Sequence, residues 1–162
     1  MTGEKRICII TNMSDIVGYM VTWTTYGTWL QGDKRGYVKN GQVLPGDKII
    51  NEANRKLQKY DPIVLSKNER EVICQTITDE AACRGQKILA LMVCSNHVHL
   101  VAEPCKFSIE EAVSIYKNKA TSALRKFGRP GRLWTKGFDK RFCFNANELA
   151  ARINYVVNHP DY

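Results

Sequence analysis

Several features that mark common protein classes are missing from this 162-residue sequence. No apolar run approaches the roughly 20 residues that a membrane helix needs, and the longest, residues 88–94, has the length of a strand. The first residues, MTGEKR, lead into no apolar core of the kind that a signal peptide carries. We therefore expect a cytoplasmic protein with no membrane partner, and the length suits a single domain.

Paired cysteine motifs are also missing, although the chain has six cysteines. They are Cys8, Cys74, Cys83, Cys94, Cys105 and Cys143. No two are spaced as C-x-x-C, which argues against a zinc knuckle, and nothing points to a secreted protein with a disulfide framework. We expect reduced and mostly buried thiols.

Acidic residues are scarce in one part of the chain. Lys and Arg number 24 against 16 Asp and Glu, which gives a net charge of +8. Residues 112–147 contain nine basic residues and a single acid, Asp139, so the surplus is concentrated there. A local basic excess is typical of a surface that follows nucleic-acid phosphates; a solvated basic face is the alternative.

The pattern of turn and apolar residues predicts an α+β fold. We expect strands over residues 19–25, 86–94 and 97–102 and a short strand within 133–144, with residues 26–36 forming a loop. Capping boxes at Ser66–Glu69 and Ser108–Glu111 predict helices to about Arg84 and Phe127. A short helix is expected over 51–59, and Asn147 can cap a last helix that runs towards Pro160. Helices interspersed among hairpin strands predict an antiparallel sheet with helices packed on it.

Histidine is rare, and two of the three histidines are two residues apart, in Asn96-His97-Val98-His99. Side chains alternate between the faces of a strand, so His97 and His99 share one face while Val98 shares the other with further apolar residues. We expect the apolar face to pack under helices and the histidine face to stay open. Two imidazoles in this arrangement can hold a metal ion; a pair of surface or hydrogen-bonded histidines is the alternative.

The third histidine lies at the end of the predicted last helix, four residues after Tyr155, which places both on one face. That face lies to the side of the apolar stripe, which consists of Leu149, Ile153, Val156, Val157 and Pro160. Tyr155 is therefore not simply a core aromatic, although a half-buried surface tyrosine is the alternative. His159 precedes a proline, which disfavours helical angles. Its side chain could leave this face, and Asn158 would then take its place.

These motifs together resemble the single-tyrosine HUH transposases, a family that includes the insertion-sequence-200/605-like and REP-associated tyrosine transposases. The likeness covers residues 18–160. It comprises Thr24–Asp33 (TTYGTWLQGD), Asn96–Val101 (NHVHLV), Tyr116–Thr121 (YKNKAT), Leu133–Gly137 (LWTKG) and Tyr155–Pro160 (YVVNHP). The chain departs from the family pattern at His159, where Asn or Gln is usual, and at Ser95, where Pro is frequent.

The resemblance implies a ferredoxin-like, RRM-like HUH domain over residues 18–160, preceded by an extension of residues 1–17. Tyr155 would attack single-stranded, hairpin-bearing DNA to form a 5′-phosphotyrosine, with Mg²⁺ or Mn²⁺ held by His97, His99 and His159. Imidazole ligands by themselves favour a transition metal. The residues expected to bind DNA are Lys117, Lys119, Arg125, Arg132, Trp134 and Lys136. Relatives often pair, so a homodimer is a further expectation.

Three other functions stay open at this point. The chain could be a domesticated, catalytically inactive protein that binds hairpin DNA. It could be a relative that nicks DNA for replication or plasmid transfer, although such proteins usually carry further domains. It could also be a metal-dependent phosphoesterase that uses water, which would cleave without a covalent adduct and without Tyr155.

Overall fold

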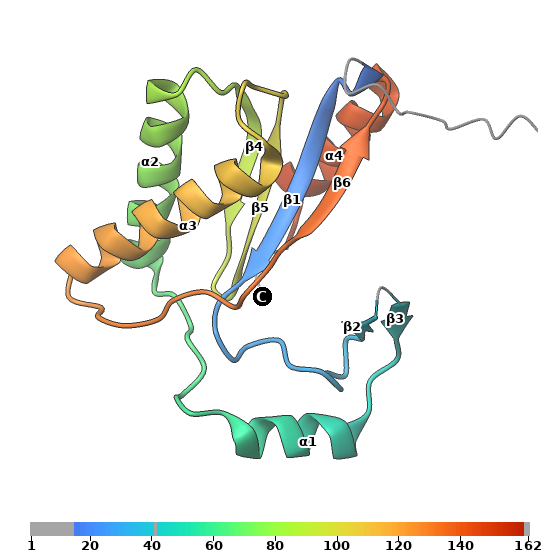
Figure 1. The fold of residues 1–162 in the computed structure, drawn as a ribbon, viewed down its shortest axis with the longest axis vertical. Coiled ribbons are helices and arrows are strands. Elements are labelled where there is room, and N and C mark those ends of the chain that lie inside the picture. Colours follow the sequence, from blue (N-terminus) through green and yellow to red (C-terminus); the bar gives the residue numbers. More distant parts are fainter. Residues whose placement is uncertain (1–14, 41, 161–162) are drawn as a thin grey trace, which may run out of the picture.

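A four-stranded antiparallel sheet forms the centre of the computed structural model, which describes residues 15–40 and 42–160 (Figure 1). Its strands, in the order β4-β5-β1-β6, are β4 (Ile88–Val93), β5 (His97–Ala102), β1 (Gly18–Thr24) and β6 (Asp139–Cys143). With the helices between them, this order is that of a ferredoxin-like βαββαβ unit. Cys8 and most of the predicted N-terminal extension lie outside the described residues.

Two long helices, α2 (Lys67–Cys83) and α3 (Ile109–Lys126), cover one face of the sheet (Figure 1). Both begin at the predicted capping boxes, in which the serine side chain and the N3 glutamate each accept a backbone N–H. The apolar face of β5, which carries Val98 and Leu100, packs in the same core as Ile73 and Ile77 of α2 and Tyr116 of α3. The helix–sheet core is thus where the alternation along β5 predicts it.

The last helix, α4 (Ala146–Val157), lies across the opposite face of the sheet. Val156 is buried against Val101 of β5 and Met20 of β1 in a second, smaller core. The prediction of an open histidine face is therefore wrong, because α4 covers it and every residue of β5 is buried. The N-cap of α4 is Asn145, whose side chain accepts the Glu148 N–H at 2.9 Å, and not the predicted Asn147.

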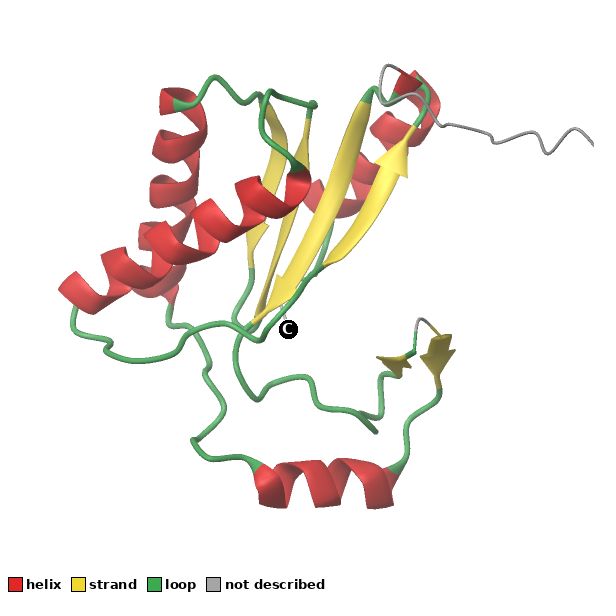
Figure 2. Cartoon of the chain, in the orientation of Figure 1, coloured by secondary structure: helices red, strands yellow, loops and turns green. Residues whose placement is uncertain are grey.

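Residues 26–62 form an arm that extends from the end of β1 and returns before α2 (Figure 2). It contains β2 (Tyr37–Lys39) and β3 (Gln42–Leu44), a short hairpin that the sequence analysis missed, and α1 (Lys48–Leu57), which lies slightly before the predicted helix. A backbone hydrogen bond from the Ile63 N–H to the Tyr26 carbonyl joins the two ends of the arm, and one from the Leu65 N–H to the Ser95 carbonyl attaches the chain after the arm to the turn between β4 and β5. The arm therefore begins and ends beside the turn that precedes His97.

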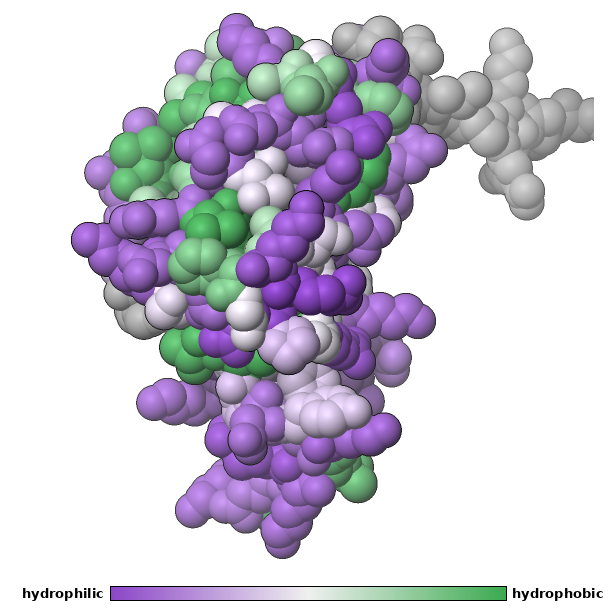
Figure 3. Space-filling view, turned by 90° about the vertical axis from the view of Figure 1, so that its left-hand side faces the viewer, coloured by the Kyte–Doolittle hydropathy of each residue, from purple (hydrophilic) through white to green (hydrophobic). Residues whose placement is uncertain are grey.

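The other general predictions can be checked against the described part of the chain. Its five cysteines are all free thiols; Cys94 and Cys143 are buried, and Cys83 is exposed. No described helix is both long enough and apolar enough to span a membrane. Hydrophilic side chains cover most of the side where α2 and α3 lie, interrupted by apolar patches (Figure 3).

Candidate active site

His97 and His99 lie on β5, between β1 and β4, with backbone partners on both sides. The two rings face α4, and their centroids are 4.7 Å apart. Only 4% of His97 and 5% of His99 is exposed. Their positions are fixed by a strand that is hydrogen-bonded on both edges, so the two imidazoles form a rigid pair.

His159 completes a cluster of three imidazoles. Helix α4 ends at Val157, and the following turn directs the His159 ring towards β5. Its Nε2 atom lies 3.0 Å from Nε2 of His97 and 3.3 Å from Nε2 of His99. The neighbouring Asn158 instead donates its side-chain N–H to the Asn154 carbonyl. Of the two residues considered, His159 is the one that the structure brings to the histidine pair.

Hydrogen bonds at the opposite ring nitrogens orient the strand histidines. Nδ1 of His97 lies 2.6 Å from Oδ1 of Asn96, which can only accept, so this nitrogen carries the proton. Nδ1 of His99 lies 2.7 Å from the Thr22 hydroxyl. A proton on Nδ1 leaves the Nε2 lone pair free, and such partners commonly fix histidines that bind metals. The lone pair of His97 is thus aimed into the cluster.

Burial keeps these imidazoles uncharged at neutral pH. Desolvation, together with the neighbouring His159, lowers the pKa of His97 to about 4, and desolvation with the other two histidines lowers that of His99 to about 3. Burial also lowers the pKa of His159. Neutral imidazole is the form that binds a cation, so the cluster is ready for an ion without losing protons first.

The donor set itself fits a divalent ion. Nitrogens bound to one tetrahedral ion lie about 3.3 Å apart, since metal–nitrogen bonds are about 2.0 Å long. The two Nε2 separations at His159, 3.0 and 3.3 Å, agree with this value. Three uncharged nitrogens with few protons among them satisfy one another poorly, whereas a cation would satisfy all three lone pairs. His97 and His159 could therefore hold a metal ion, with His99 beside them. The group in the described residues whose ligand atoms all lie within 4.8 Å of one another consists of His97, His159 and Cys94.

Tyr155 stands at the edge of this cluster. Its ring lies 5.5 Å from the His99 ring and 5.2 Å from the His159 ring, between centroids. It is 48% exposed, unlike the two buried strand histidines. A phenol placed this way can be reached by a large ligand while its ring rests on two members of the cluster. The structure thus brings together all four residues that the sequence singled out as catalytic or metal-binding.

Cys94 also belongs to the cluster, and the sequence analysis missed it. Its Sγ atom and one ring nitrogen each of His97 and His159 all lie within 4.8 Å of one another. The thiol is fully buried, and burial raises its pKa. The sequence did contain a signal: Cys94 and His97 flank a two-residue turn, and residues that flank such a turn face each other across a hairpin.

A second residue that the sequence analysis missed is Arg35, in the arm. Its guanidinium makes two hydrogen bonds with Asp33, of 2.7 and 2.6 Å, and lies 4.0 Å above the Trp29 ring. Nη2 also donates to the carbonyl of Thr28, the residue whose hydroxyl contacts the Asn96 carbonyl. The Arg35 charge contributes to the low pKa of His97. A fixed cation therefore lies near the histidine cluster.

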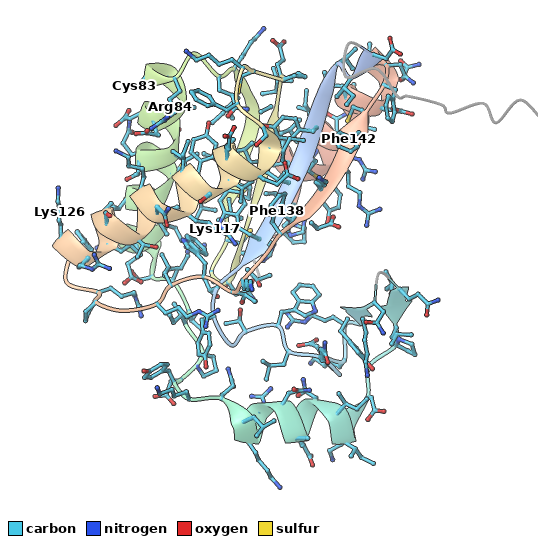
Figure 4. The ribbon with its side chains drawn as sticks, viewed as in Figure 1. Cys83, Arg84, Lys117, Lys126, Phe138 and Phe142 are labelled. Atoms are coloured by element: carbon cyan, nitrogen blue, oxygen red, sulfur yellow. The ribbon has the colours of Figure 1, made fainter. Side chains whose placement is uncertain are left out.

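Two of the residues predicted to bind DNA make contacts within the protein. Trp134 is only 7% exposed; it packs edge-on against Trp23 and donates its indole N–H to the Lys117 carbonyl. Its ring has little surface to offer to a base. Lys117 points from α3 to the chain segment before β6, where its Nζ donates to the carbonyls of Thr135 and Gly137 (Figure 4). Burial lowers its pKa.

The remaining basic residues lie in different places. Arg132 stacks over the Tyr26 ring at 5.1 Å, and Lys136 is exposed nearby in the same chain segment, which pairs with the end of β1 through Thr25 and Trp134. These two share the end of the sheet where His97 lies. Lys119 forms an ion pair with Glu80, and Arg125 is exposed near the far end of α3.

Comparison with known proteins identifies the family. A family model described as IS200-like transposase matches residues 57–159, which include the three histidines and Tyr155. The chain belongs to this family. The family predicted from the sequence motifs is thereby confirmed. A search of curated proteins finds no match.

One solved structure places this IS200-like transposase family member in the expected fold class. A REP-associated tyrosine transposase bound to a REP hairpin superposes with a TM-score of 0.56 at 12% identity, over 86% of this chain and 64% of that one. The chain therefore spans less than two thirds of that protein's length. A transposase candidate from Deinococcus radiodurans R1 has a TM-score of 0.44 at 17% identity, over 91% of this chain and 93% of that one. The first match confirms the predicted α+β fold.

Proposed function

We propose that this protein cleaves and rejoins single-stranded DNA through a covalent bond between Tyr155 and a 5′-phosphate. The observation that carries the proposal is the convergence of three imidazole Nε2 atoms, at 3.0 and 3.3 Å, beneath an exposed tyrosine whose ring contacts two of them. Membership of the IS200-like transposase family supports it. The cluster supplies what phosphodiester cleavage needs: a nucleophile beside a site for a cation.

His97, His99 and His159 would hold a divalent ion, Mg²⁺ or Mn²⁺. The all-nitrogen donor set favours Mn²⁺, since Mg²⁺ prefers oxygen ligands. When bound, such an ion neutralises negative charge on a phosphate oxygen and helps a nearby phenol to lose its proton. Asn96 and Thr22 would keep the two strand imidazoles in the orientation that binds the ion.

In the reaction, the Tyr155 oxygen attacks the phosphorus in line with the leaving group. The Tyr155 O–P bond forms, the P–O3′ bond breaks, and the departing 3′ oxygen takes up a proton to become a hydroxyl. The energy of the phosphodiester is kept in the phosphotyrosine, so a second 3′-hydroxyl can reverse the step and join new DNA. This reversal would regenerate the Tyr155 phenol.

Arg35 is the residue of the arm best placed to hold the DNA backbone. Its bonds with Asp33 and Thr28 use Nε and Nη2 and, within the described residues, leave Nη1 for a ligand. Stacking on Trp29 restrains the guanidinium further, so little entropy would be lost on binding. We propose that Arg35 contacts a phosphate next to the metal site. Arg132 and Lys136, at the same end of the sheet, would extend this contact along the strand.

The substrate we propose is single-stranded DNA that carries a hairpin. Support comes from the family and from the similar fold of a REP-associated transposase that is bound to a REP hairpin. The exposed side of Tyr155 is open to an unpaired strand. A homodimer, in which Tyr155 of one chain could serve the metal site of another, remains part of the proposal.

The experiment is an adduct assay with single-stranded hairpin oligonucleotides taken from the DNA that flanks the gene. In the presence of Mn²⁺ we expect a protein–DNA species that survives SDS. Tyr155→Phe should abolish it, whereas Tyr60→Phe, which alters another exposed tyrosine, should not. Cleavage without an adduct would favour attack by water. Salt-sensitive hairpin binding with neither cleavage nor adduct would favour the inactive, domesticated protein.

A further inference from the structure

The strand register places the Cys94 thiol on the histidine face of the sheet. Strands β4 and β5 pair with Met92 opposite His99 and Val93 opposite Val98. The next pair is Cys94 and His97, joined by a hydrogen bond of 2.8 Å from the Cys94 N–H to the His97 carbonyl. Side chains of directly opposed residues lie on the same face, with Cβ atoms about 4.5–5.5 Å apart.

The side-chain positions agree with the register. The Cys94 sulfur and ring nitrogens of His97 and His159 lie within 4.8 Å of one another, and the thiol is fully buried. Small rotamer changes would bring the sulfur and these nitrogens within bonding distance of one ion. The other fully buried thiol, Cys143, lies on β6 opposite Gly18, on the far side of β1 from β5. Only Cys94, among the described cysteines, shares the histidine cluster.

Sulfur changes which ions the cluster prefers and how many ligands it offers. Thiolate is a soft ligand that binds Zn²⁺ and Co²⁺ well and is poorly suited to Mg²⁺. The group of ligand atoms around Cys94 contains His97 and His159, and the His99 Nε2 atom lies 3.3 Å from Nε2 of His159. With His99 drawn in as the remaining ligand, the set would be tetrahedral and complete, and a zinc ion held by four protein ligands has no position left for a substrate. Three histidines alone would leave such a position open.

We propose that Cys94 is a fourth ligand for soft divalent ions and that Zn²⁺ bound this way closes the site. The expected consequence is that Zn²⁺ inhibits DNA cleavage supported by Mn²⁺, and this consequence rests on the proposed function. The thiol proton passes to the solvent as the S–Zn bond forms, and no other bond changes. Residue 94 thereby makes the protein sensitive to the balance of zinc and manganese around it.

The test uses the full-length, metal-free protein and Co²⁺ as a spectroscopic substitute for zinc. Coordinated thiolate gives Co²⁺ a charge-transfer absorption in the near ultraviolet, which imidazole ligands do not give. We expect this band in the wild type and in Cys143→Ser, which removes the other fully buried thiol, and its loss in Cys94→Ser. Zn²⁺ affinity, measured by competition with a chelating dye, should fall at least about tenfold in Cys94→Ser alone.

Two results would overturn the inference: a wild-type Co²⁺ spectrum without the charge-transfer band, or a band that persists in Cys94→Ser. The unfolding temperature of each metal-free variant shows whether serine at residue 94 disturbs the fold. If it does, Cys94→Ala gives the same comparison without a buried hydroxyl. These measurements need no DNA, so they test Cys94 as a metal ligand even if no protein–DNA adduct forms. A missing adduct would count against the proposed function alone.

The consequence is tested separately, in the adduct assay with Mn²⁺. Added Zn²⁺ should suppress adduct formation in the wild type and in Cys143→Ser. Cys94→Ser should need at least about tenfold more Zn²⁺ for half-suppression. Equal sensitivity of all three proteins to Zn²⁺ would show that zinc inhibits at another place. That result would overturn the proposal that zinc bound by Cys94 closes the site.

Discussion

The Nε2 atoms of His97 and His159 lie 3.0 Å apart although 62 positions separate the two residues in the sequence. One sits in a strand that is paired on both sides, and the other follows the end of a helix on the same face of the sheet. Folding thus assembles a site that neither segment contains alone. The metal-binding role proposed for His159 depends on this proximity.

Removal of the third imidazole should weaken metal binding. We expect His159→Ala to lower Mn²⁺ affinity by roughly 10–100-fold, because a lone pair is lost from the cluster. Asn158→Ala is the matched control, since that side chain is turned to the Asn154 carbonyl. Paramagnetic resonance of free Mn²⁺ measures both affinities. Equal affinities for wild type and His159→Ala would remove His159 from the site.

Arg35 should contribute one phosphate contact. Arg35→Ala is expected to reduce the slope of log affinity against log salt by about 0.7 for single-stranded DNA. Lys126→Ala, at the far end of α3 (Figure 4), should leave the slope nearly unchanged. Fluorescence anisotropy with Tyr155→Phe as the background keeps chemistry out of the measurement. An unchanged slope in the Arg35 variant would contradict the contact.

The metal-free protein should lose stability in mild acid. The folded pKa values of His97 and His99, about 4 and about 3, lie below the unfolded value near ~6.5. The stability that the two uncharged imidazoles contribute is therefore fully present above the unfolded pKa, and it is lost as the pH falls towards their folded pKa values. Between pH 7 and 5 the unfolded chain gains about 1–2 kcal/mol per imidazole from proton binding. Urea unfolding at pH 7 and pH 5 measures this loss of stability. His99→Gln should make the free energy of unfolding depend less on pH.

The ion pair between Glu69 and Arg129 should stabilise the connection between α2 and the segment after α3. Arg129 donates to both carboxylate oxygens, at 2.6 and 3.0 Å, and lowers the pKa of Glu69. Glu69→Gln keeps an acceptor for the capping box and loses the charge, so we expect a cost of about 0.5–1.5 kcal/mol.

The second capping box supplies the control for this measurement. Glu111 has the same capping role on α3, with no arginine among its described partners, so Glu111→Gln should cost less. The difference between the two variants should shrink as the pH falls below about 4.5, because the unfolded wild-type chain then binds a proton at Glu69 that the folded chain, with its lowered Glu69 pKa, does not yet bind. Denaturant midpoints at pH 7 and 4 test this, and equal losses at pH 7 would contradict the ion pair's contribution.

Local patterns in the sequence predict much of this structure. Both capping boxes and the alternation along residues 97–102 concern neighbours in the chain, and their physics is the same in any fold. The helical spacing of Tyr155 and His159 is similarly local. These patterns suffice to predict the two long helices, the pairing of His97 with His99 and the family.

Tertiary contacts explain what the sequence did not predict. Nothing near residue 97 indicates that α4 would cover the histidine face, because that contact joins distant segments. The placement of Arg35 depends on how the arm returns to the sheet. The burial of Trp134 could not be predicted from the sequence, because aromatic side chains with basic neighbours suit both a protein core and a DNA surface.

The identity of the DNA-linked residue tests the central proposal most directly. The SDS-resistant species formed with Mn²⁺ and a hairpin oligonucleotide can be digested with protease and nuclease and analysed by mass spectrometry. We predict a 5′-nucleotide joined through phosphate to Tyr155 in the peptide that contains α4. A nucleotide on any other residue, or cleaved DNA with an unmodified Tyr155 peptide throughout the time course, would contradict the account.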